Sequence, residues 1–413
     1  MLAAAADQAA GVSPTRPRLE LADVFRLYAP AYRDSHRLPV AHLKVMRAIE
    51  TCRTAALGGH IEQCNECGYQ RQSYNSCRNR HCPKCQSLCK ARWLEDRKAD
   101  LLPVGYFHMV FTLPHELNPL VLSNKNVLCD LLFKAVSETL LEFGRNNLGG
   151  KIGLIAVLHT WDQTLSDHFH LHCLVPAGAL SRDRSRWIPA RDNFLFPVRA
   201  LSKVYRGKML DLLEEAFDRG GLKFVGRCEG LSDTERFKRW GEKLSAKKWV
   251  VYARKPFSNP ERVLDYLGRY THRVAISNNR IIAIKEGKVS FHYRDRKTGK
   301  QKRMTLVAEE FIRRFLLHVL PESFVRIRHY GILANRTKKE ELGCCRRLIG
   351  DEGEPRSEIN KTGKEMMEEV GGADLLVCPE CKVGRMVKVG ELPSERAKEV
   401  ETDSSRLTRM DSS

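Results

Sequence analysis

Residues 52 to 89 most constrain how this chain can fold, because they hold seven of its 14 cysteines and few residues that could form a hydrophobic core. Short Gly-, Asn- and Cys-rich pieces of this kind need another source of stability, and a bound metal supplies it. Two Cys-x-x-Cys pairs, separated by 14 residues, can place four thiolates around one ion. We therefore predict a small zinc-binding domain with the ligands Cys64, Cys67, Cys82 and Cys85.

Other candidate ligands lie close to these two pairs. Cys77 and His81 lie between them, and Cys52 and His60 precede them, so the sequence leaves open an exchange of ligands or a second ion. Near the C-terminus, a third pair could close a second zinc site with two adjacent cysteines of the preceding segment; the residues concerned are Cys378, Cys381, Cys344 and Cys345. Clustered pairs in a chain without a secretory signal favour metal over disulfides.

The charge of the chain indicates a polyanionic partner. The formal net charge is +20, and residues 351–413 hold 10 basic and 15 acidic side chains, so residues 1–350 carry +25. With 42% hydrophobic residues, the chain is not a disordered polar one, and nucleic acid is the expected partner. No stretch approaches the roughly 18 apolar residues of a membrane span, and the Ala-rich start lacks a basic signal region. We expect a cytoplasmic protein, neither secreted nor membrane-bound.

Hydrophobic periodicity predicts a mixed α and β body. Helices are expected over residues 121–143, 198–217 and 307–320 and from about residue 260, and strands over residues 106–113, 152–158, 168–175 and 249–254, with a hairpin over 281–293. The expected organisation is an N-terminal tail with helices (1–50), the zinc-binding domain (51–100), a catalytic body (101–345) and a charged tail with a Cys-x-x-Cys pair (346–413). The predicted fold class is α+β.

Three histidines alternate with apolar residues in the segment His168 to Val175. Successive side chains of a strand point to opposite faces, so His168, His170 and His172 share one face. Two imidazoles two residues apart can chelate one divalent ion and leave positions for a phosphate oxygen and a third protein ligand. That third ligand could be His159, Asp162 or Gln163, among which sequence spacing does not choose, and His168 could instead support the ligands.

Tyr266 and Tyr270 are spaced i and i+4, which places two phenols on one helical face about one turn apart. Both could therefore reach one site, and neighbouring arginines supply the positive charge that a tyrosine nucleophile needs. Downstream, the stretch from Arg280 to Arg303 carries nine Lys or Arg, interleaved with aromatic residues, which suits single-stranded DNA. The predicted DNA-binding residues are Arg269, Arg273, Arg280, Arg294, Arg296, Lys297, Lys300, Lys302 and Arg303.

Taken together, these passages resemble the rolling-circle transposases of the HUH (His-hydrophobic-His) endonuclease superfamily, of the two-tyrosine insertion-sequence type with an N-terminal zinc-binding domain. The resemblance covers most of the chain, and its passages occur in the same order: residues 58–67, 76–85, 102–114, 168–175, 264–277 and 324–331. Such a collinear series is more specific than any single motif.

The resemblance implies an antiparallel sheet flanked by helices, a catalytic Mg²⁺ or Mn²⁺ at His170 and His172, nucleophiles at Tyr266 and Tyr270, and structural zinc. It implies that the chain nicks and rejoins single-stranded DNA, at element ends and target, through 5′-phosphotyrosine intermediates, and associates with the nucleoid when bound to DNA. Two alternatives remain: a plasmid replication initiator or relaxase of the same superfamily, and a catalytically inactive zinc-dependent DNA-binding protein.

Overall fold

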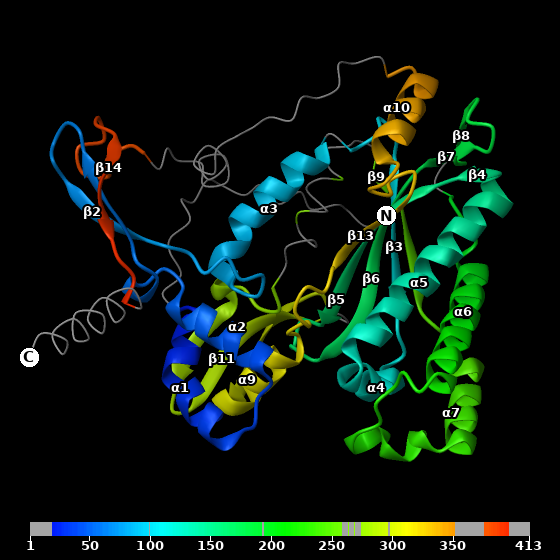
Figure 1. Cartoon of the computed structure of the whole chain (residues 1–413), viewed down its shortest axis with the longest axis horizontal. Coiled ribbons are helices and arrows are strands. Elements are labelled where there is room, and N and C mark those ends of the chain that lie inside the picture. Colours follow the sequence, from blue (N-terminus) through cyan, green and yellow to red (C-terminus); the bar gives the residue numbers. More distant parts are fainter. Residues whose placement is uncertain are drawn as a thin grey trace, which may run out of the picture.

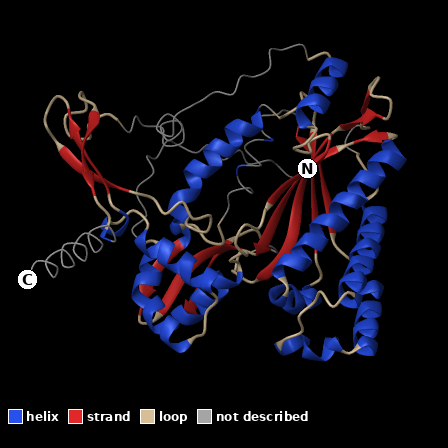
Figure 2. Ribbon diagram, viewed as in Figure 1, coloured by secondary structure: helices blue, strands red, loops and turns tan. Residues whose placement is uncertain are grey.

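The computed structural model describes residues 19–98, 100–191, 194–257, 263, 268, 274–295, 298–351 and 376–395. Its helices are α1 (Leu21–Ser35), α2 (Val40–Thr51), α3 (Pro83–Lys98), α4 (Asn118–Ser123), α5 (Lys125–Phe143), α6 (Val198–Asp218), α7 (Thr234–Ala246), α9 (Ala308–Leu317) and α10 (Lys338–Ile349). The strands are β1 (Gly59–Cys64), β2 (Gln70–Tyr74), β3 (Tyr106–Thr112), β4 (Gly150–Lys151), β5 (Gly153–Trp161), β6 (Asp167–Pro176), β7 (Gly178–Ser181), β8 (Trp187–Pro189), β9 (Val251–Phe257), β10 (Ile281–Lys285), β11 (Lys288–Arg294), β12 (Gln301–Val307), β13 (Ile327–Gly331) and β14 (Met386–Leu392). This mixture confirms the predicted α+β class (Figure 1, Figure 2).

The largest sheet has the strand order β13-β5-β6-β3-β9, and every neighbouring pair is antiparallel. Helices α5 and α6 run side by side over one face (Figure 1). Leu154, Ala156 and Leu158 of β5 belong to the core beneath these helices, whereas Ile155 and Val157 belong to a separate cluster on the opposite face. The central strands are thus buried on both faces, which explains their nearly continuous apolar sequences. The predicted antiparallel sheet flanked by helices is present.

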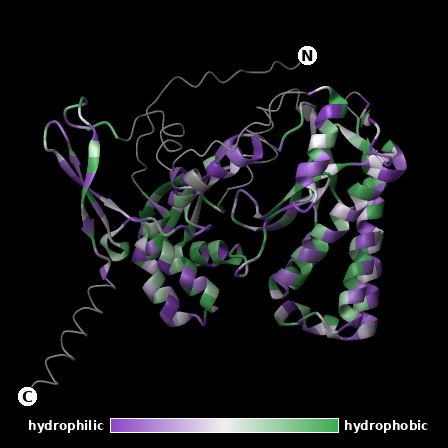
Figure 3. Cartoon of the chain, turned by 45° about the horizontal axis from the view of Figure 1, so that its top comes forward, coloured by the Kyte–Doolittle hydropathy of each residue, from purple (hydrophilic) through white to green (hydrophobic). Residues whose placement is uncertain are grey.

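A second core lies beside the large sheet and joins segments far apart in the sequence. Helices α1, α2 and α9 pack against the antiparallel sheet β10-β11-β12, with edge-on aromatic pairs between Phe25 and Phe315 and between Phe291 and Phe311. The helices of this region alternate between apolar and polar residues, as the hydropathy colouring shows (Figure 3). Because residues 21–52 and 275–319 share this core, the N-terminal helices pack with part of the expected catalytic body. The domain boundaries themselves stay a prediction.

A third, small sheet has the order β14-β1-β2 and brings a strand near the C-terminal end of the described chain to the hairpin of residues 59–74. Strand β14 pairs antiparallel with β1 from Gly59 opposite Leu392 to Cys64 opposite Met386. In Figure 1 this sheet projects at the left, with the red strand β14 added to the blue hairpin of β1 and β2 on the β1 side. The sequence showed only a charged tail here, so this strand is an addition to the predicted elements.

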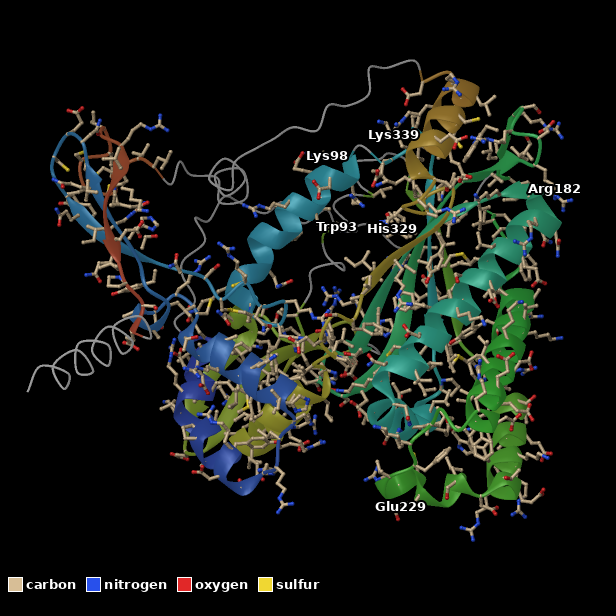
Figure 4. The ribbon with its side chains drawn as sticks, in the orientation of Figure 1. Trp93, Lys98, Arg182, Glu229, His329 and Lys339 are labelled. Atoms are coloured by element: carbon tan, nitrogen blue, oxygen red, sulfur yellow. The ribbon has the colours of Figure 1, made fainter. Side chains whose placement is uncertain are left out.

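Helix α3 spans the distance between the cysteine-rich region and the large sheet (Figure 4). Near its C-terminal end, Arg97 pairs with Asp100 at 3.0 Å and lies 3.4 Å from Nε2 of His329 on β13. Strand β13 ends at Gly331, whose φ is 63° and where an added Cβ would lie 1.8 Å from the carbonyl oxygen of Ile152. Only glycine fits this turn, because the backbone conformation and the close approach both exclude a side chain.

Candidate functional site

Three histidines converge on the face of the large sheet opposite α5 and α6. Strands β5 and β6 pair so that His159 stands directly opposite His170, and His172 follows two residues later on the same face. The side-chain nitrogens of His159, His170 and His172 lie within 4.8 Å of one another, a spacing at which all three can bind one metal ion. His159 and His170 are buried and His172 is half-buried. His168 shares the face, as the alternation predicted, but is not part of this group.

Hydrogen bonds orient two of these rings. His170 donates Nδ1–H to the carbonyl oxygen of His168 at 2.8 Å, which leaves its Nε2 with a lone pair. That Nε2 lies 3.1 Å from Nε2 of His172, and Nδ1 of His172 lies 2.8 Å from Nε2 of His108 on β3. Burial, with a smaller effect from the Arg254 charge, lowers the pKa of His108 to about 3, so this ring is neutral at physiological pH. The Nε2 atoms of His170 and His172 therefore point towards one another, while the Nδ1 atoms of both rings are held by hydrogen bonds.

The three candidates for the third ligand have different environments. His159 belongs to the histidine group, and its ring stacks on Trp161 at 5.2 Å between centroids. Asp162 Oδ1 instead accepts hydrogen bonds from the backbone N–H groups of Thr164 and Ser166 and from the Thr164 hydroxyl, at 2.7–3.0 Å. This carboxylate thereby closes the turn between β5 and β6. Gln163 and Asp162 both line the same cavity as the histidines.

The histidines open into a cavity of about 580 Å³. Its far side is formed by Arg254 of β9 and by Arg294, Asp295 and Gly299 at the tip of the β11–β12 hairpin. Arg254 stands opposite His108 in the β3–β9 pairing and is exposed. Asp295 pairs with Lys302, so its negative charge is offset locally. The cavity thus combines three imidazoles that could hold a metal ion with two guanidinium groups, which suits a phosphate group.

Sequence reasoning did not find two of these residues, His108 and Arg254. Each lies on a predicted strand, but their position beside the His-x-His pair depends on β3 pairing with β6 on one side and β9 on the other. A polar side chain at an alternate position of an otherwise apolar strand is the signal that could have indicated them. Tyr252 and Arg254 share one face of β9 in this way, and the tyrosine hydroxyl accepts a hydrogen bond from the Arg254 Nε–H at 3.2 Å.

The predicted DNA-binding residues have different roles in the structure. Arg280 is engaged within the fold: it donates to the backbone carbonyls of His292, Ala275 and Gln163, and so connects β11 to the cavity edge. Arg294 lines the cavity, while Lys300 is exposed. Lys302 pairs with Asp295, and Arg303 donates to the Ser290 hydroxyl at 3.0 Å. Arg269, Arg273, Arg296 and Lys297 lie outside the described residues.

Tyr266 and Tyr270, the predicted nucleophiles, also lie outside the described residues. Val263, on one side of Tyr266, is fully buried in the cluster that includes Ile155 and Val157 on the histidine face. Gly268, between the two tyrosines, lies against α3, where an added Cβ would be 2.6 Å from Cε of Lys90.

Eight of the cysteines that the structure describes form two separate groups of four. One consists of Cys52, Cys77, Cys82 and Cys85, between the end of α2 and the start of α3. The other consists of Cys64, Cys67, Cys378 and Cys381. The prediction that the two N-terminal Cys-x-x-Cys pairs share one ion is therefore wrong. Strand β1 carries Cys64 to the far end of a hairpin, about 16 Å along the strand at about 3.3 Å per residue, while the second pair stays at its base.

The alternative ligands considered from the sequence are also resolved. Cys77 joins the first group, and His81 does not, although it is adjacent to Cys82. Burial, with a smaller effect from Arg80, lowers the pKa of His81 to about 3. His60 faces Glu62 at 3.2 Å instead.

The possibility that the C-terminal pair shares a site with Cys344 and Cys345 does not agree with the grouping in the structure. Cys344 and Cys345 lie on α10 and are buried in its core, while the Cys378–Cys381 pair meets the N-terminal hairpin.

Comparison with known proteins identifies two regions. Residues 153–341 match a family model described as "Putative transposase", and residues 24–113 match one described as "Transposase zinc-binding domain". The chain is 50% identical over 376 residues to "Putative transposase y4qJ" of Sinorhizobium fredii, covering 90% of this chain and 94% of that protein. It is 28% identical over 289 residues to the transposase for insertion sequence element IS801 of Pseudomonas savastanoi pv. phaseolicola, covering 69% of this chain and 68% of that protein. No solved structure is significantly similar.

The two matched regions cover the features described above. The zinc-binding match includes the first cysteine group, and the transposase match includes the three converging histidines. Within the described part of the chain, no helix has the length and apolar character needed to cross a membrane. The chain therefore belongs to the IS91/IS801-type family of rolling-circle HUH transposases and carries the zinc-binding domain of that family.

Proposed function

We propose that this transposase nicks and rejoins single-stranded DNA through 5′-phosphotyrosine intermediates, with Tyr266 and Tyr270 as nucleophiles. The observation that carries the proposal is the group of three converging imidazoles in a cavity whose other side bears Arg254 and Arg294. A scissile phosphate is the anion that such a site would hold, because metal and guanidinium groups together offset the charge that develops during phosphoryl transfer.

His159, His170 and His172 would hold a divalent ion, Mg²⁺ or Mn²⁺. They fit it because one nitrogen of each ring lies within 4.8 Å of the others, and because His170 donates its Nδ1–H to a backbone carbonyl, so that its Nε2 carries the lone pair that can bind metal. Nitrogen donors favour Mn²⁺ over Mg²⁺, which prefers oxygen. When bound, the ion would act as a Lewis acid and position the scissile phosphate.

The tyrosines would carry the covalent chemistry. The phenol oxygen bonds to phosphorus as the phosphorus–O3′ bond breaks; the phenol gives up its proton and the 3′-oxygen gains one. Bonds of the same kind form and break, so no nucleotide is consumed, and no P-loop motif is present in the sequence. Two nucleophiles allow a second strand transfer while the first adduct persists. Support comes from Val263 and Gly268, which pack against the histidine face of the sheet and against α3.

The remaining basic residues would bind the DNA strand that enters the cavity. Arg254 and Arg294 are exposed at the cavity and would contact the scissile phosphate and the phosphates next to it. Lys300, Lys302 and Arg303 extend the positive charge along the β11–β12 hairpin. Arg280 would act indirectly, since its donors hold the backbone at the cavity edge.

The first cysteine group would hold the structural zinc of the family's domain. Sγ of Cys85 lies 3.6 Å from Sγ of Cys52 and 3.6 Å from Sγ of Cys77. A zinc ion with bonds of about 2.3 Å to four thiolates gives sulfur–sulfur distances of about 3.8 Å, so the spacing fits. Because Cys52, Cys82 and Cys85 also belong to the core of α1, α2 and α9, this ion would hold the start of α3 against that core.

The test is detection of a covalent protein–DNA adduct on a denaturing gel, using labelled single-stranded DNA that contains the element's ends, with Mn²⁺ or Mg²⁺. The variants are Tyr266→Phe, Tyr270→Phe and both together, with Tyr293→Phe on β11 as a control that removes a phenol elsewhere in the basic stretch. We expect a metal-dependent adduct that only the double variant loses. An adduct that persists in the double variant would exclude these nucleophiles, and binding by the wild type without any adduct would favour the inactive DNA-binding alternative.

A further inference from the structure

The second cysteine group joins opposite ends of the chain. Cys64 and Cys67 lie at the turn between β1 and β2, and Cys378 and Cys381 lie just before β14. Sγ of Cys64 is 3.7 Å from Sγ of Cys381, and Sγ of Cys67 is 3.6 Å from Sγ of Cys378. All four are free thiols. These distances exceed a disulfide bond of about 2.05 Å and match the edge of a zinc–thiolate tetrahedron, about 3.8 Å.

The two halves of the group have the same backbone conformation. In the first, the N–H of Gly68 donates to the carbonyl of Cys64 at 3.2 Å; in the second, the N–H of Lys382 donates to the carbonyl of Cys378 at 3.0 Å. The two donors hold equivalent positions, four residues after the first cysteine, and both have positive φ, 73° and 57°. Lysine rarely adopts this conformation, so its presence indicates that the loop is held by something other than its own preference.

Backbone N–H groups in both halves are directed at the sulfurs. Glu66 and Cys67 donate to Sγ of Cys64 at 3.4 and 3.5 Å, and Gly384 donates to Sγ of Cys381 at 3.3 Å. Such bonds stabilise thiolates, which are the form that binds zinc. Gly384 also lacks a side chain where one would interfere, because an added Cβ would lie 2.4 Å from Sγ of Cys64.

Apolar contacts alone are too few to hold this sheet together. Its hydrophobic cluster contains only Cys64, Cys378 and Met386 as buried residues, with Cys381 packed against them. Val387 and Val389 of β14 are exposed. A three-stranded sheet with so small a core needs another source of stability.

We infer that Cys64, Cys67, Cys378 and Cys381 bind a second structural zinc ion, which fastens the C-terminal strand β14 to the N-terminal hairpin. Each chain then carries two zinc ions, and the second is shared between segments more than three hundred residues apart. The family match to the zinc-binding domain ends at residue 113, so it includes only half of this ligand set. The inference does not depend on the proposed chemistry of the tyrosines.

The test is metal content of the full chain, purified without chelator and measured by inductively coupled plasma mass spectrometry. We expect two zinc ions per chain for the wild type and one for the double variant Cys378→Ser, Cys381→Ser. The double variant Cys344→Ala, Cys345→Ala is the control and should keep two. One zinc ion in the wild type, or no loss in the Cys378→Ser, Cys381→Ser protein, would overturn the inference. Circular dichroism separates loss of one site from unfolding of the whole chain.

A second comparison keeps every cysteine in place. Gly384→Ala, two residues before β14, puts a Cβ against Sγ of Cys64, whereas Gly390→Ala, within β14, meets its nearest atom at 3.7 Å. We expect Gly384→Ala to lower the affinity for the second zinc ion about 10- to 100-fold, measured in competition with a chelator. Gly390→Ala should bind both zinc ions as the wild type does. Equal zinc retention by the two alanine variants would contradict the assigned ligand set.

Discussion

Removal of the His108 ring tests whether the histidine group is a metal site. If Nε2 of His172 binds metal, its Nδ1–H donates to Nε2 of His108, which is 2.8 Å away. His108 can accept because its pKa is lowered to about 3 and it stays neutral. Loss of a partner that orients a metal-binding histidine weakens metal binding about 10- to 100-fold. That range corresponds to about 1.4–2.8 kcal/mol, and it agrees with the cost of about 1–3 kcal/mol for an unsatisfied buried group.

The assay is a titration of Mn²⁺ into the zinc-saturated full chain at pH 7, with the heat of binding measured by isothermal titration calorimetry. We expect His108→Ala to bind Mn²⁺ about 10- to 100-fold more weakly, and His108→Gln, whose amide oxygen can accept the same hydrogen bond, to recover much of the loss. His115→Ala is the control, because that side chain is 86% exposed. Mn²⁺ affinity within twofold of the wild type in His108→Ala would refute the assigned orientation of His172.

Three further predictions follow from the same geometry. The His159→Ala variant should bind Mn²⁺ more weakly, with little change in stability. The Asp162→Ala variant should bind Mn²⁺ as the wild type does but lose about 1–3 kcal/mol of unfolding free energy, measured with urea. The opposite pattern would mean that Asp162 is the ligand and His159 the structural residue. The Gly331→Ala variant should lose more than about 4 kcal/mol of unfolding free energy or fail to fold. The Gly207→Ala variant, in α6 where an added Cβ meets nothing within 4 Å, should instead gain about 0.5–1 kcal/mol. Similar urea midpoints for the two variants would contradict the close approach at β13. Burial lowers the pKa of His318 to about 4, so below pH 6.5 the unfolded chain binds a proton at this ring that the folded chain does not bind. The free energy of unfolding should therefore fall by about 2 kcal/mol between pH 6.5 and 5, and should depend less steeply on pH in a His318→Gln variant. An equally steep dependence in that variant would assign the effect to another group.

Much of the site could be predicted because it depends on short-range geometry. The alternation of a strand places His170 and His172 on one face whatever the rest of the chain does, and the structure has them so. The hairpin around Glu286 and Gly287 was likewise readable, since both residues adopt the positive φ that such a turn requires.

The third ligand of the metal could not be chosen from the sequence. His159, Asp162 and Gln163 are all close to the motif along the chain, but the register of β5 against β6 puts His159 opposite His170 and leaves Asp162 to close the turn. A shift of one residue would have turned His159 to the other face. His108 and Arg254 were missed for the same reason, because strand pairing alone brings them to the site.

The cysteines show the division between sequence and tertiary structure most clearly. The spacing of each Cys-x-x-Cys pair is local, and by itself it determined that these residues form metal-binding pairs and that their segment needs an ion to fold. Which pairs share an ion was decided only when β14 paired with β1 and brought Cys378 to Cys67, while Cys82 stayed at the base of the hairpin with Cys52. Two cysteines within four residues are held together by the chain itself, but contacts across three hundred residues depend on strand pairing that no local pattern encodes.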